Sequence, residues 1–385
     1  MKRVLLLCFV LMISAVVFGQ ESEDDNITVT DGLQHRVPLE EVIIDDFSNF
    51  SDPYLPLSRA DRDDILKARN RLRPFCVESA GRCFSPAYEG VEAANQWLAA
   101  DNSVIGYVAE DGQPYAFPFR LLSFHGLIND VLAEQPILVV YCAYCNSAAV
   151  YSRTLNGETL EFGNTSTFYQ SLLTMFDRQS ESLWLMVNGQ AIVGDRTGEQ
   201  LEQLPAIITT WERWTSLHPE TQVLARREGY VDYSQDLFSD YRTRLNLNRF
   251  PFPVSEELLE DERLRFGEQV VVLSDEAMSV AYPLSAVTGG VIHDTFSDDS
   301  IVVLSADEEK TAATYYAELE DGSTLDLEYE PETGNWLDTN TQSLVNINGQ
   351  VISGPLQGQT LTPYLSGYMY WFAAAVIYPD IRIHE

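Results

Sequence analysis

The chain has 385 residues, with 58 Asp and Glu against 24 Lys and Arg, and a formal net charge of −34 at pH 7. This charge argues against nucleic acid or anionic lipid as a partner, because both are bound mainly through Lys and Arg. With 45% hydrophobic and 11% aromatic residues, the chain is rich enough in apolar side chains to form folded cores. Its length suits two modest domains.

The first residues have the features of a secretory signal peptide. Lys2 and Arg3 precede an apolar run from Val4 to Val17, and the small residue Gly19 closes the segment. The run is shorter than the ~20 apolar residues that a spanning helix needs. We therefore expect residues 1–19 to be a signal peptide and the mature protein to be secreted or periplasmic, without an integral membrane span. An uncleaved membrane anchor is the alternative.

Cleavage would remove Cys8 and leave Cys76, Cys83, Cys142 and Cys145. An even set of cysteines in an oxidising compartment permits three pairings. Cys76 and Cys83 flank a short loop and are predicted to form a disulfide. The Cys-x-x-C spacing of Cys142 and Cys145 fits a disulfide, a grip on a soft metal ion, or a nucleophile with its resolving thiol.

Residues 20–84 are predicted to form an acidic lead-in followed by a surface helix. The segment up to about Pro38 is polar and lacks periodicity, which is typical of a flexible stretch. Between Asp61 and Arg73, charges alternate around a thin apolar stripe, and Pro74 ends the predicted helix. A second short helix is expected at Val91–Leu98.

From Val104 the pattern changes to short runs of period two that are separated by turn dipeptides. These turns are Asp111-Gly112, Asn156-Gly157, Asn188-Gly189, Asp321-Gly322 and Asn348-Gly349. Asn-Gly and Asp-Gly favour the positive backbone angles of tight hairpins. The body of the protein is therefore predicted to be mainly β (α+β), with short helices.

The turns recur in a fixed order, together with other landmarks. Ala116-Phe117-Pro118-Phe119 matches Ala281-Tyr282-Pro283-Leu284, Asn156-Gly157 matches Asp321-Gly322, Asn188-Gly189-Gln190 matches Asn348-Gly349-Gln350, Trp211 matches Trp371, and His218-Pro219 matches Tyr378-Pro379. Such spacing indicates an internal duplication. We expect two tandem β-rich units, residues 85–229 and 263–385, joined by a connector at residues 230–262.

The two predicted units do not carry the same chemistry. Cys142 falls opposite Ala306, Cys145 falls opposite Glu309, and His125 falls opposite a Gly-Gly pair. The second unit has no soft metal ligand at these positions. The first unit is therefore interpreted as the working copy and the second as a degenerate structural partner.

Several motifs of the chain occur together in one known family. They are Trp97-Leu98, Val104-Ile105-Gly106, Tyr115-x-x-Pro118-x-Arg120, His125 with Asn129-Asp130, Tyr141-Cys142-x-x-Cys145-Asn146-Ser147-Ala148, Met175-Phe176-Asp177-Arg178, Ser182-Leu183-Trp184, Thr209-Thr210-Trp211 and His218-Pro219. From about Ser85 to the C-terminus the chain resembles the uncharacterised prokaryotic family catalogued as domain of unknown function 3179. The resemblance places His125, Cys142, Cys145, Asp177 and Arg178 in the family's pattern but brings no established activity.

The chain departs from that pattern in two places. Phe124-His125-Gly126 stands where the family usually has Trp-His-Glu, and Ala143-Tyr144 stands where it usually has Pro-Leu between the cysteines. The missing carboxylate beside His125 argues against an acid/base role for that histidine.

The predicted candidate site is a zinc or copper site with Cys142, Cys145 and His125 as ligands, since thiolate and imidazole suit both metals. Asp177, Arg178, Asn129 and Asn146 are candidates for the residues around these ligands. Each candidate also has a structural interpretation: His125 as a hydrogen-bonded core residue, and Asp177 with Arg178 as a turn anchor or salt bridge.

Three classes of function are compatible with these residues. The first is an exported protein that binds a soft metal ion, and the second is a non-enzymatic binding or scaffold module with structural disulfides. The third, a thiol oxidoreductase, is disfavoured because the residues after Cys145 are typical of a strand, whereas thioredoxin-type motifs continue into a helix. The sequence identifies no substrate and no protein partner.

Overall fold

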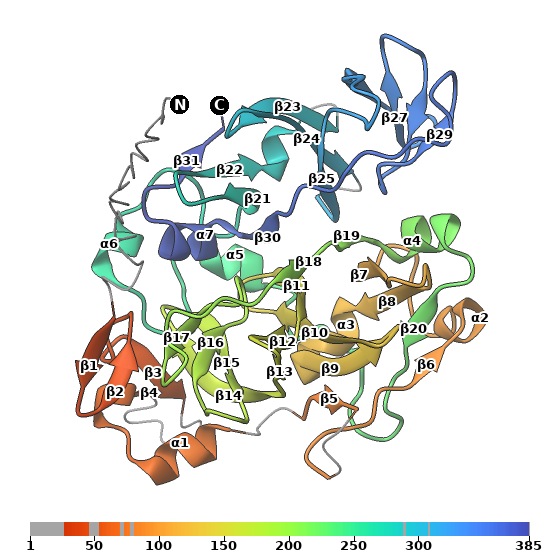
Figure 1. The fold of residues 1–385 in the computed structure, drawn as a ribbon. Helices are drawn as coiled ribbons and strands as arrows, with labels where there is room; N and C mark the ends of the chain where they lie inside the picture. Colours follow the sequence, from red (N-terminus) through yellow and green to blue (C-terminus); the bar gives the residue numbers. More distant parts are fainter. Residues whose placement is uncertain are drawn as a thin grey trace, which may run out of the picture.

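The computed structural model describes residues 27–45, 54–69, 73–77, 81–287, 290–306 and 309–384. The predicted signal peptide, residues 1–19, lies outside the described residues. Strands dominate the described part, which confirms the predicted mainly β class (Figure 1). None of the helices in those ranges is long and apolar enough to cross a bilayer.

Residues 27–84 contribute five strands, β1 (Thr28–Thr30), β2 (Leu33–His35), β3 (Val42–Asp45), β4 (Tyr54–Pro56) and β5 (Phe75–Cys76). The predicted flexible lead-in is therefore wrong for its described part. Asp31 and Gly32 have positive φ angles of 51° and 83° and turn β1 back onto β2. Strands can pair through their backbones at or near a sheet edge without a periodic pattern of apolar residues. The polar, non-periodic sequence of this segment therefore did not reveal its strands.

The first predicted unit holds the strands β6 to β20. They are β6 (Tyr88–Glu89), β7 (Ser103–Val108), β8 (Pro114–Pro118), β9 (Leu127–Leu132), β10 (Gln135–Cys142), β11 (Ser147–Ser152), β12 (Thr154–Leu155), β13 (Glu158–Thr159), β14 (Phe162–Tyr169), β15 (Leu172–Asp177), β16 (Leu183–Leu185), β17 (Ala191–Val193), β18 (Gln203–Leu204), β19 (Ile207–Thr210) and β20 (Gln222–Leu224). Two sheets with the orders β1-β2-β17-β16-β15-β14-β3-β4 and β18-β11-β10-β9-β5 form most of this unit.

The second predicted unit holds the strands β21 to β31. They are β21 (Gln269–Ser274), β22 (Ser279–Pro283), β23 (Val291–Phe296), β24 (Asp299–Ala306), β25 (Thr311–Tyr316), β26 (Leu327–Glu330), β27 (Asn335–Asp338), β28 (Leu344–Val345), β29 (Val351–Ser353), β30 (Gly367–Tyr370) and β31 (Arg382–Ile383). Figure 1 shows this unit in teal and blue above the first.

Equivalent strands of the two units pair in the same way. In the first unit β7 pairs antiparallel with β8 and β19, and β8 pairs parallel with β20. In the second unit β21 pairs antiparallel with β22 and β30, and β22 pairs parallel with β31. The duplication itself stays a prediction.

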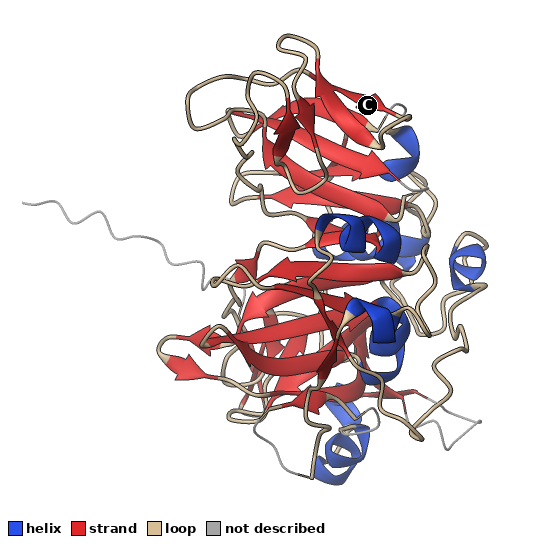
Figure 2. Cartoon of the chain, turned by 90° about the vertical axis from the view of Figure 1, so that its right-hand side faces the viewer, coloured by secondary structure: helices blue, strands red, loops and turns tan. Residues whose placement is uncertain are grey.

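Short helices cover the ends of the strands. They are α1 (Arg62–Ala68), α2 (Val91–Ala94), α3 (Phe119–His125), α4 (Trp211–Leu217), α5 (Tyr241–Leu245), α6 (Glu256–Leu259) and α7 (Trp371–Ile377). Most of them lie along one side of the stacked strands (Figure 2). A capping box between Asp61 and Asp64 starts α1, which ends earlier than predicted, at Ala68. The helix predicted at Val91–Leu98 ends at Ala94 and continues as turns.

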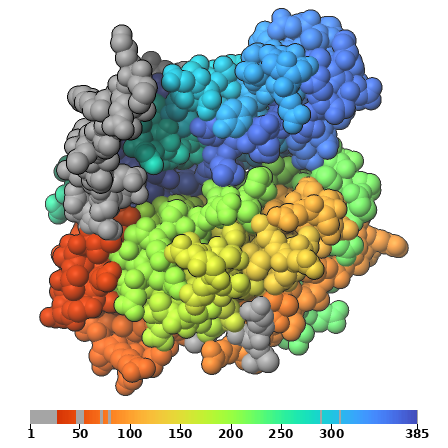
Figure 3. All heavy atoms as spheres, viewed as in Figure 1, coloured from red at the N-terminus to blue at the C-terminus, as the bar shows by residue number. Residues whose placement is uncertain are grey.

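The two units share a sheet. Its order is β23-β24-β25-β19-β7-β8-β20-β6, so strands of the second unit continue directly into strands of the first through Ile208 and Ala312. In addition, the backbone N–H of Tyr370 in β30 donates to the carbonyl of Cys145, in the turn before β11, at 2.8 Å. Figure 3 shows the resulting seam, where the blue and green surfaces meet.

One glycine is required by the packing of α4 on the shared sheet. A Cβ atom on Gly106 in β7 would lie 2.4 Å from ring atoms of Trp214. We expect Gly106→Ala to lower the free energy of unfolding by about 1–3 kcal/mol, as overpacking in a core does, measured by urea denaturation. Gly90→Ala is the control, because a Cβ there meets nothing within 4 Å. Equal losses in the two variants would contradict this account.

Candidate functional site

Cys142 and Cys145 form a disulfide in the turn between β10 and β11. Both residues are fully buried, and the backbone N–H of Cys145 donates to the carbonyl of Cys142 at 3.1 Å. A metal ligand or a nucleophile needs a thiolate, which a disulfide does not supply. After Cys145 the chain enters the strand β11 and no helix, as the sequence predicts.

His125 lies at the end of α3, and both of its ring nitrogens have partners. Nδ1 is 2.7 Å from the carbonyl oxygen of Arg73, which can only accept, so Nδ1 carries the proton. Nε2 then accepts from the hydroxyl of Tyr233 at 2.7 Å. The ring is fully buried and packs against Phe75 and Tyr230, with centroid distances of 4.5 and 5.3 Å. Its lone pair is therefore occupied and faces neither Cys142 nor Cys145.

The three predicted metal ligands do not come together. Among the described residues, one group of three possible ligands has its atoms within 4.8 Å of one another, and it consists of Cys76, Cys83 and Glu161. Cys76 and Cys83 are joined in a disulfide, so this group also lacks thiolates. The residues present therefore do not fit a zinc or copper ion in this oxidised form.

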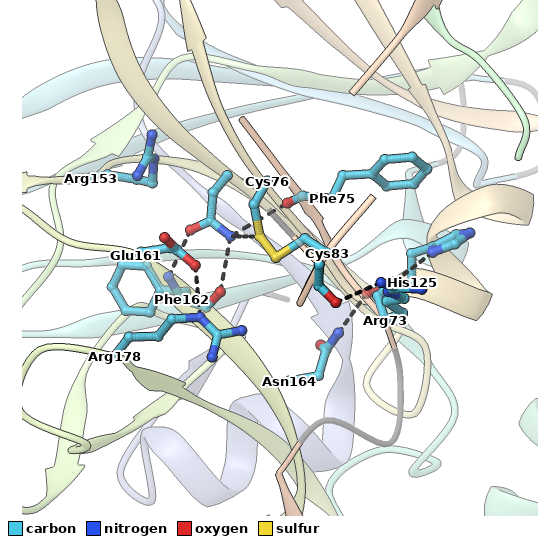
Figure 4. The surroundings of a disulfide bond; sticks show 12 residues. Arg73, Phe75, Cys76, Cys83, His125, Arg153, Glu161, Phe162, Asn164 and Arg178 are labelled. Carbon is cyan, nitrogen blue, oxygen red and sulfur yellow. Dashed lines mark hydrogen bonds and ion pairs between the residues drawn. A yellow bond between two sulfur atoms is a disulfide. The ribbon is translucent and has the colours of Figure 1, made fainter. Parts of the chain in front are cut away.

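Instead, residues of the family pattern gather around the disulfide of Cys76 and Cys83. Figure 4 shows this bond with Glu161 and Arg178 on one side and His125 with Arg73 on the other. Glu161 and Arg178 form an ion pair at 2.7 Å. This disulfide, and not the Cys-x-x-C turn, is thus the centre to which His125 and Arg178 belong.

Asn129 connects this centre to the neighbouring sheet. Its side chain exchanges two hydrogen bonds with the backbone of Phe162 in β14, at 2.7 and 2.9 Å, and its Nδ2 is 3.5 Å from Sγ of Cys76. The residue is almost fully buried. Asn129 is therefore a positioning residue that fixes β14 beside the disulfide.

Asp177 and Asn146, the remaining predicted residues, lie elsewhere. Asp177 is fully buried and accepts from the backbone and hydroxyl of Ser180 and from Nε1 of Trp184, at 2.6 to 2.9 Å. These bonds make it a turn anchor, one of the alternatives that the sequence left open. Asn146 follows the Cys-x-x-C turn with a φ of 45° and donates to Gln269 of the second unit at 2.8 Å.

A hollow of about 610 Å³ opens beside the Cys76–Cys83 disulfide. We call it the arginine hollow, because Arg69, Arg73, Arg82 and Arg178 line it together with Glu181, Phe176 and Tyr230. The guanidinium groups of Arg69 and Arg178 lie over the ring of Phe176, at 4.6 and 5.4 Å from its centroid. Four cationic side chains thus face one acidic residue in a chain of strongly negative net charge.

The positive charges in the hollow are incompletely neutralised. Arg69 pairs with Glu181 at 2.7 Å, but the buried Nε of Arg69 and the buried Nη2 of Arg178 have no hydrogen-bond partner among the described residues. Burial lowers the pKa of Arg178, the charges of Arg82 and Arg69 act in the same direction, and Glu161 opposes them. The arrangement therefore favours the arrival of an additional negative charge.

The sequence contained a signal for this hollow that was not used. Seven of the 24 basic residues stand between positions 59 and 82, namely Arg59, Arg62, Lys67, Arg69, Arg71, Arg73 and Arg82. In so acidic a protein, such a local concentration marks a candidate anion site. Arg178 and Tyr230 could not be added to it from the sequence, because the fold alone brings them to the same place.

Residues 82–381 match the family model described as "Protein of unknown function (DUF3179)". The match covers most of the chain, so the protein belongs to this family, as its motifs indicated. No curated protein and no solved structure matches the chain.

The state of the cysteines is directly testable. We expect no free thiol among the four mature cysteines before reduction, measured by thiol titration under denaturing conditions. Removing a disulfide by Cys76→Ala with Cys83→Ala should lower the free energy of unfolding by about 2–3 kcal/mol, as expected for so short a loop. Two free thiols accompanied by stoichiometric metal would contradict the disulfide of Cys142 and Cys145 and restore the predicted metal site.

His125 should make stability depend on pH. Burial lowers its pKa from 6.5 to about 4 in the folded protein. Between these values the unfolded chain binds more protons, so stability is full above pH 6.5 and falls as the pH drops towards 4, by up to about 3 kcal/mol. Urea denaturation across this range should show the fall in the wild type and a smaller fall in His125→Gln.

The control for this measurement is His293→Gln, which changes an exposed histidine on β23. It should keep the pH dependence of the wild type. A His125→Gln variant with an unchanged pH dependence would show that His125 is not the titrating group.

Proposed function

We propose that this protein is an exported, non-enzymatic binding protein that holds a small anionic ligand in the arginine hollow. The observation that carries the proposal is the pair of buried guanidinium N–H groups, on Arg69 and Arg178, that have no partner in the part of the chain that the structure describes. A carboxylate or a phosphate group supplies the paired acceptor oxygens that arginine forks bind. Export is supported by the N-terminal sequence and by two disulfides, which persist in oxidising compartments.

The hollow has the properties of a small-ligand site. Its volume of about 610 Å³ lies within the range of such sites, about 300–1,000 Å³. Phe176 and Tyr230 add aromatic surface to the cationic lining. A ligand with an anionic group and a compact apolar part would match both kinds of lining.

Two features of the fold hold the cationic side chains in place. The disulfide closes the loop that carries Arg82, and Arg73 donates to the carbonyl of Gly81 at 2.7 Å. Tyr230 stacks on His125, which is itself bonded to the carbonyl of Arg73. In this proposal the disulfide and His125 are positioning elements, and the arginines bind the ligand.

We infer further that the second unit is a duplicated copy with a supporting role. The shared strand order supports this inference, as does the lack of counterparts to Cys142, Cys145 and His125 in the second unit. Metal binding by Cys142 and Cys145 after reduction stays a prediction. The thiol titration described above tests it.

Isothermal titration calorimetry with matched probes tests the anion site. Phenyl phosphate and phenylacetate carry the two candidate anionic groups on the same ring, and benzyl alcohol is their neutral counterpart. We expect at least one anion to bind and the alcohol not to bind. The stronger of the two anions identifies the group that the hollow prefers.

Two variants locate this binding. Arg82 is exposed, so Arg82→Gln should keep the fold and weaken anion binding, and adding Arg178→Gln should raise Kd by about tenfold or more. Arg244→Gln is the matched control, because Arg244 pairs with Asp240 at the surface outside the hollow. The proposal fails if neither anion binds, or if the double variant binds as tightly as the wild type.

A further inference from the structure

A second cavity, which we call the junction pocket, lies where the two units and the connector meet. It has a volume of about 440 Å³, and Asn146 of the Cys-x-x-C turn, Arg242 of α5 and Tyr370 of β30 all line it. It shares no lining residue with the arginine hollow. An inference about this pocket therefore does not depend on the proposed anion site.

The junction pocket contains a buried polar group without a partner. Gln269, at the start of β21, is only 2% exposed, and its Oε1 accepts from Nδ2 of Asn146 at 2.8 Å. Asn146 in turn accepts from the hydroxyl of Tyr141 at 3.0 Å. Nε2 of Gln269 has no hydrogen-bond partner within the described ranges. If both amides were turned over together, Oε1 would be the atom left without a partner, so in either orientation one polar atom of Gln269, a residue that lines the pocket, is unused.

The charges around the pocket cancel. The lining contains three cationic and three anionic side chains, namely Arg120, Arg242, Lys310, Asp101, Asp236 and Glu309. Arg242 pairs with Glu309 at 2.8 Å, and Lys310 pairs with Asp101 at 3.0 Å. In contrast to the arginine hollow, this pocket offers no excess charge to an ion, so its ligand should be neutral.

Aromatic rings also line the pocket. Phe119 and Tyr141 pack against each other with centroids 4.2 Å apart, and Tyr368 and Tyr370 line the pocket from the second unit. Aromatic side chains offer a flat apolar face, and tyrosine adds a polar tip. A ligand that fits this lining has an apolar C–H face bordered by hydroxyl groups. These hydroxyl groups can both donate and accept hydrogen bonds.

We propose that the junction pocket binds a small neutral saccharide. Its C–H face packs on the tyrosine rings, and one of its hydroxyl oxygens accepts from Nε2 of Gln269. The volume accommodates a ligand of one or two sugar units and lies in the ordinary range of small-ligand pockets. Because residues of both units contribute, the site exists only in the complete chain.

Saturation-transfer difference NMR on the mature protein tests this proposal, with glucose, N-acetylglucosamine, maltose and cellobiose as probes. We expect transfer to at least one of them. Gln269→Leu removes the free donor and should raise Kd by about tenfold, the factor that corresponds to ~1.4 kcal/mol. Tyr370→Ala removes a stacking face and should have the same effect, since the bond of its backbone N–H to Cys145 is unchanged.

The matched control is Gln135→Leu. Gln135 lies at the other end of β10, where it accepts from the hydroxyl of Tyr107, and this variant should bind the saccharide as the wild type does. The proposal is overturned if none of the four saccharides shows transfer in the wild type. It is also overturned if transfer persists unchanged in folded Gln269→Leu and Tyr370→Ala proteins.

Discussion

Backbone hydrogen bonds join the two predicted units at their junction. Ile208 of β19 and Ala312 of β25 join strands of both units into one sheet, and Tyr370 of β30 donates to Cys145 of the first unit. Such bonds are made only when two extended edges meet in register, because each edge otherwise carries unpaired N–H and C=O groups. The junction is therefore part of the folded core, and the pocket at this junction depends on it.

The placement of charge separates the two cavities. Most of the chain is acidic, yet Arg69, Arg82 and Arg178 converge on one hollow next to a disulfide. Bringing like charges together costs free energy, which the neighbouring Glu161 and Glu181 offset only in part. At the junction the three cationic and three anionic side chains balance in number, and two ion pairs join four of them. The same fold thus presents one electrically unbalanced cavity and one balanced cavity.

The sequence predicted the class of fold because its signals are local. A dipeptide such as Asn188-Gly189 determines its own turn, and the alternation of apolar residues shows which face of a strand is buried. Strands β1 and β2 were missed because edge pairing uses the backbone, which leaves no mark on side-chain periodicity. Local signals were therefore sufficient for the mainly β body and insufficient for its edges.

The candidate site was harder to predict because it depends on contacts between distant residues. His125 stands 17 residues before Cys142 in the chain, but its ring turns to Arg73 and Tyr233, which are 52 and 108 residues away. Spacing along the chain does not determine the direction in which such a side chain points. Of the family residues, Arg178 lines the hollow, whereas Cys142 and Cys145 lie in a different turn.

The contact between His125 and Tyr233 has a consequence for the thermodynamics of binding. Tyr233 belongs to the connector, and Tyr230, three residues earlier, stacks on the same imidazole and lines the arginine hollow. These contacts hold the connector side of the hollow in place without a ligand. Because this wall is ordered during folding, the protein would lose less conformational entropy when the proposed anion binds. Such preorganisation leaves more of the gross interaction free energy available as affinity.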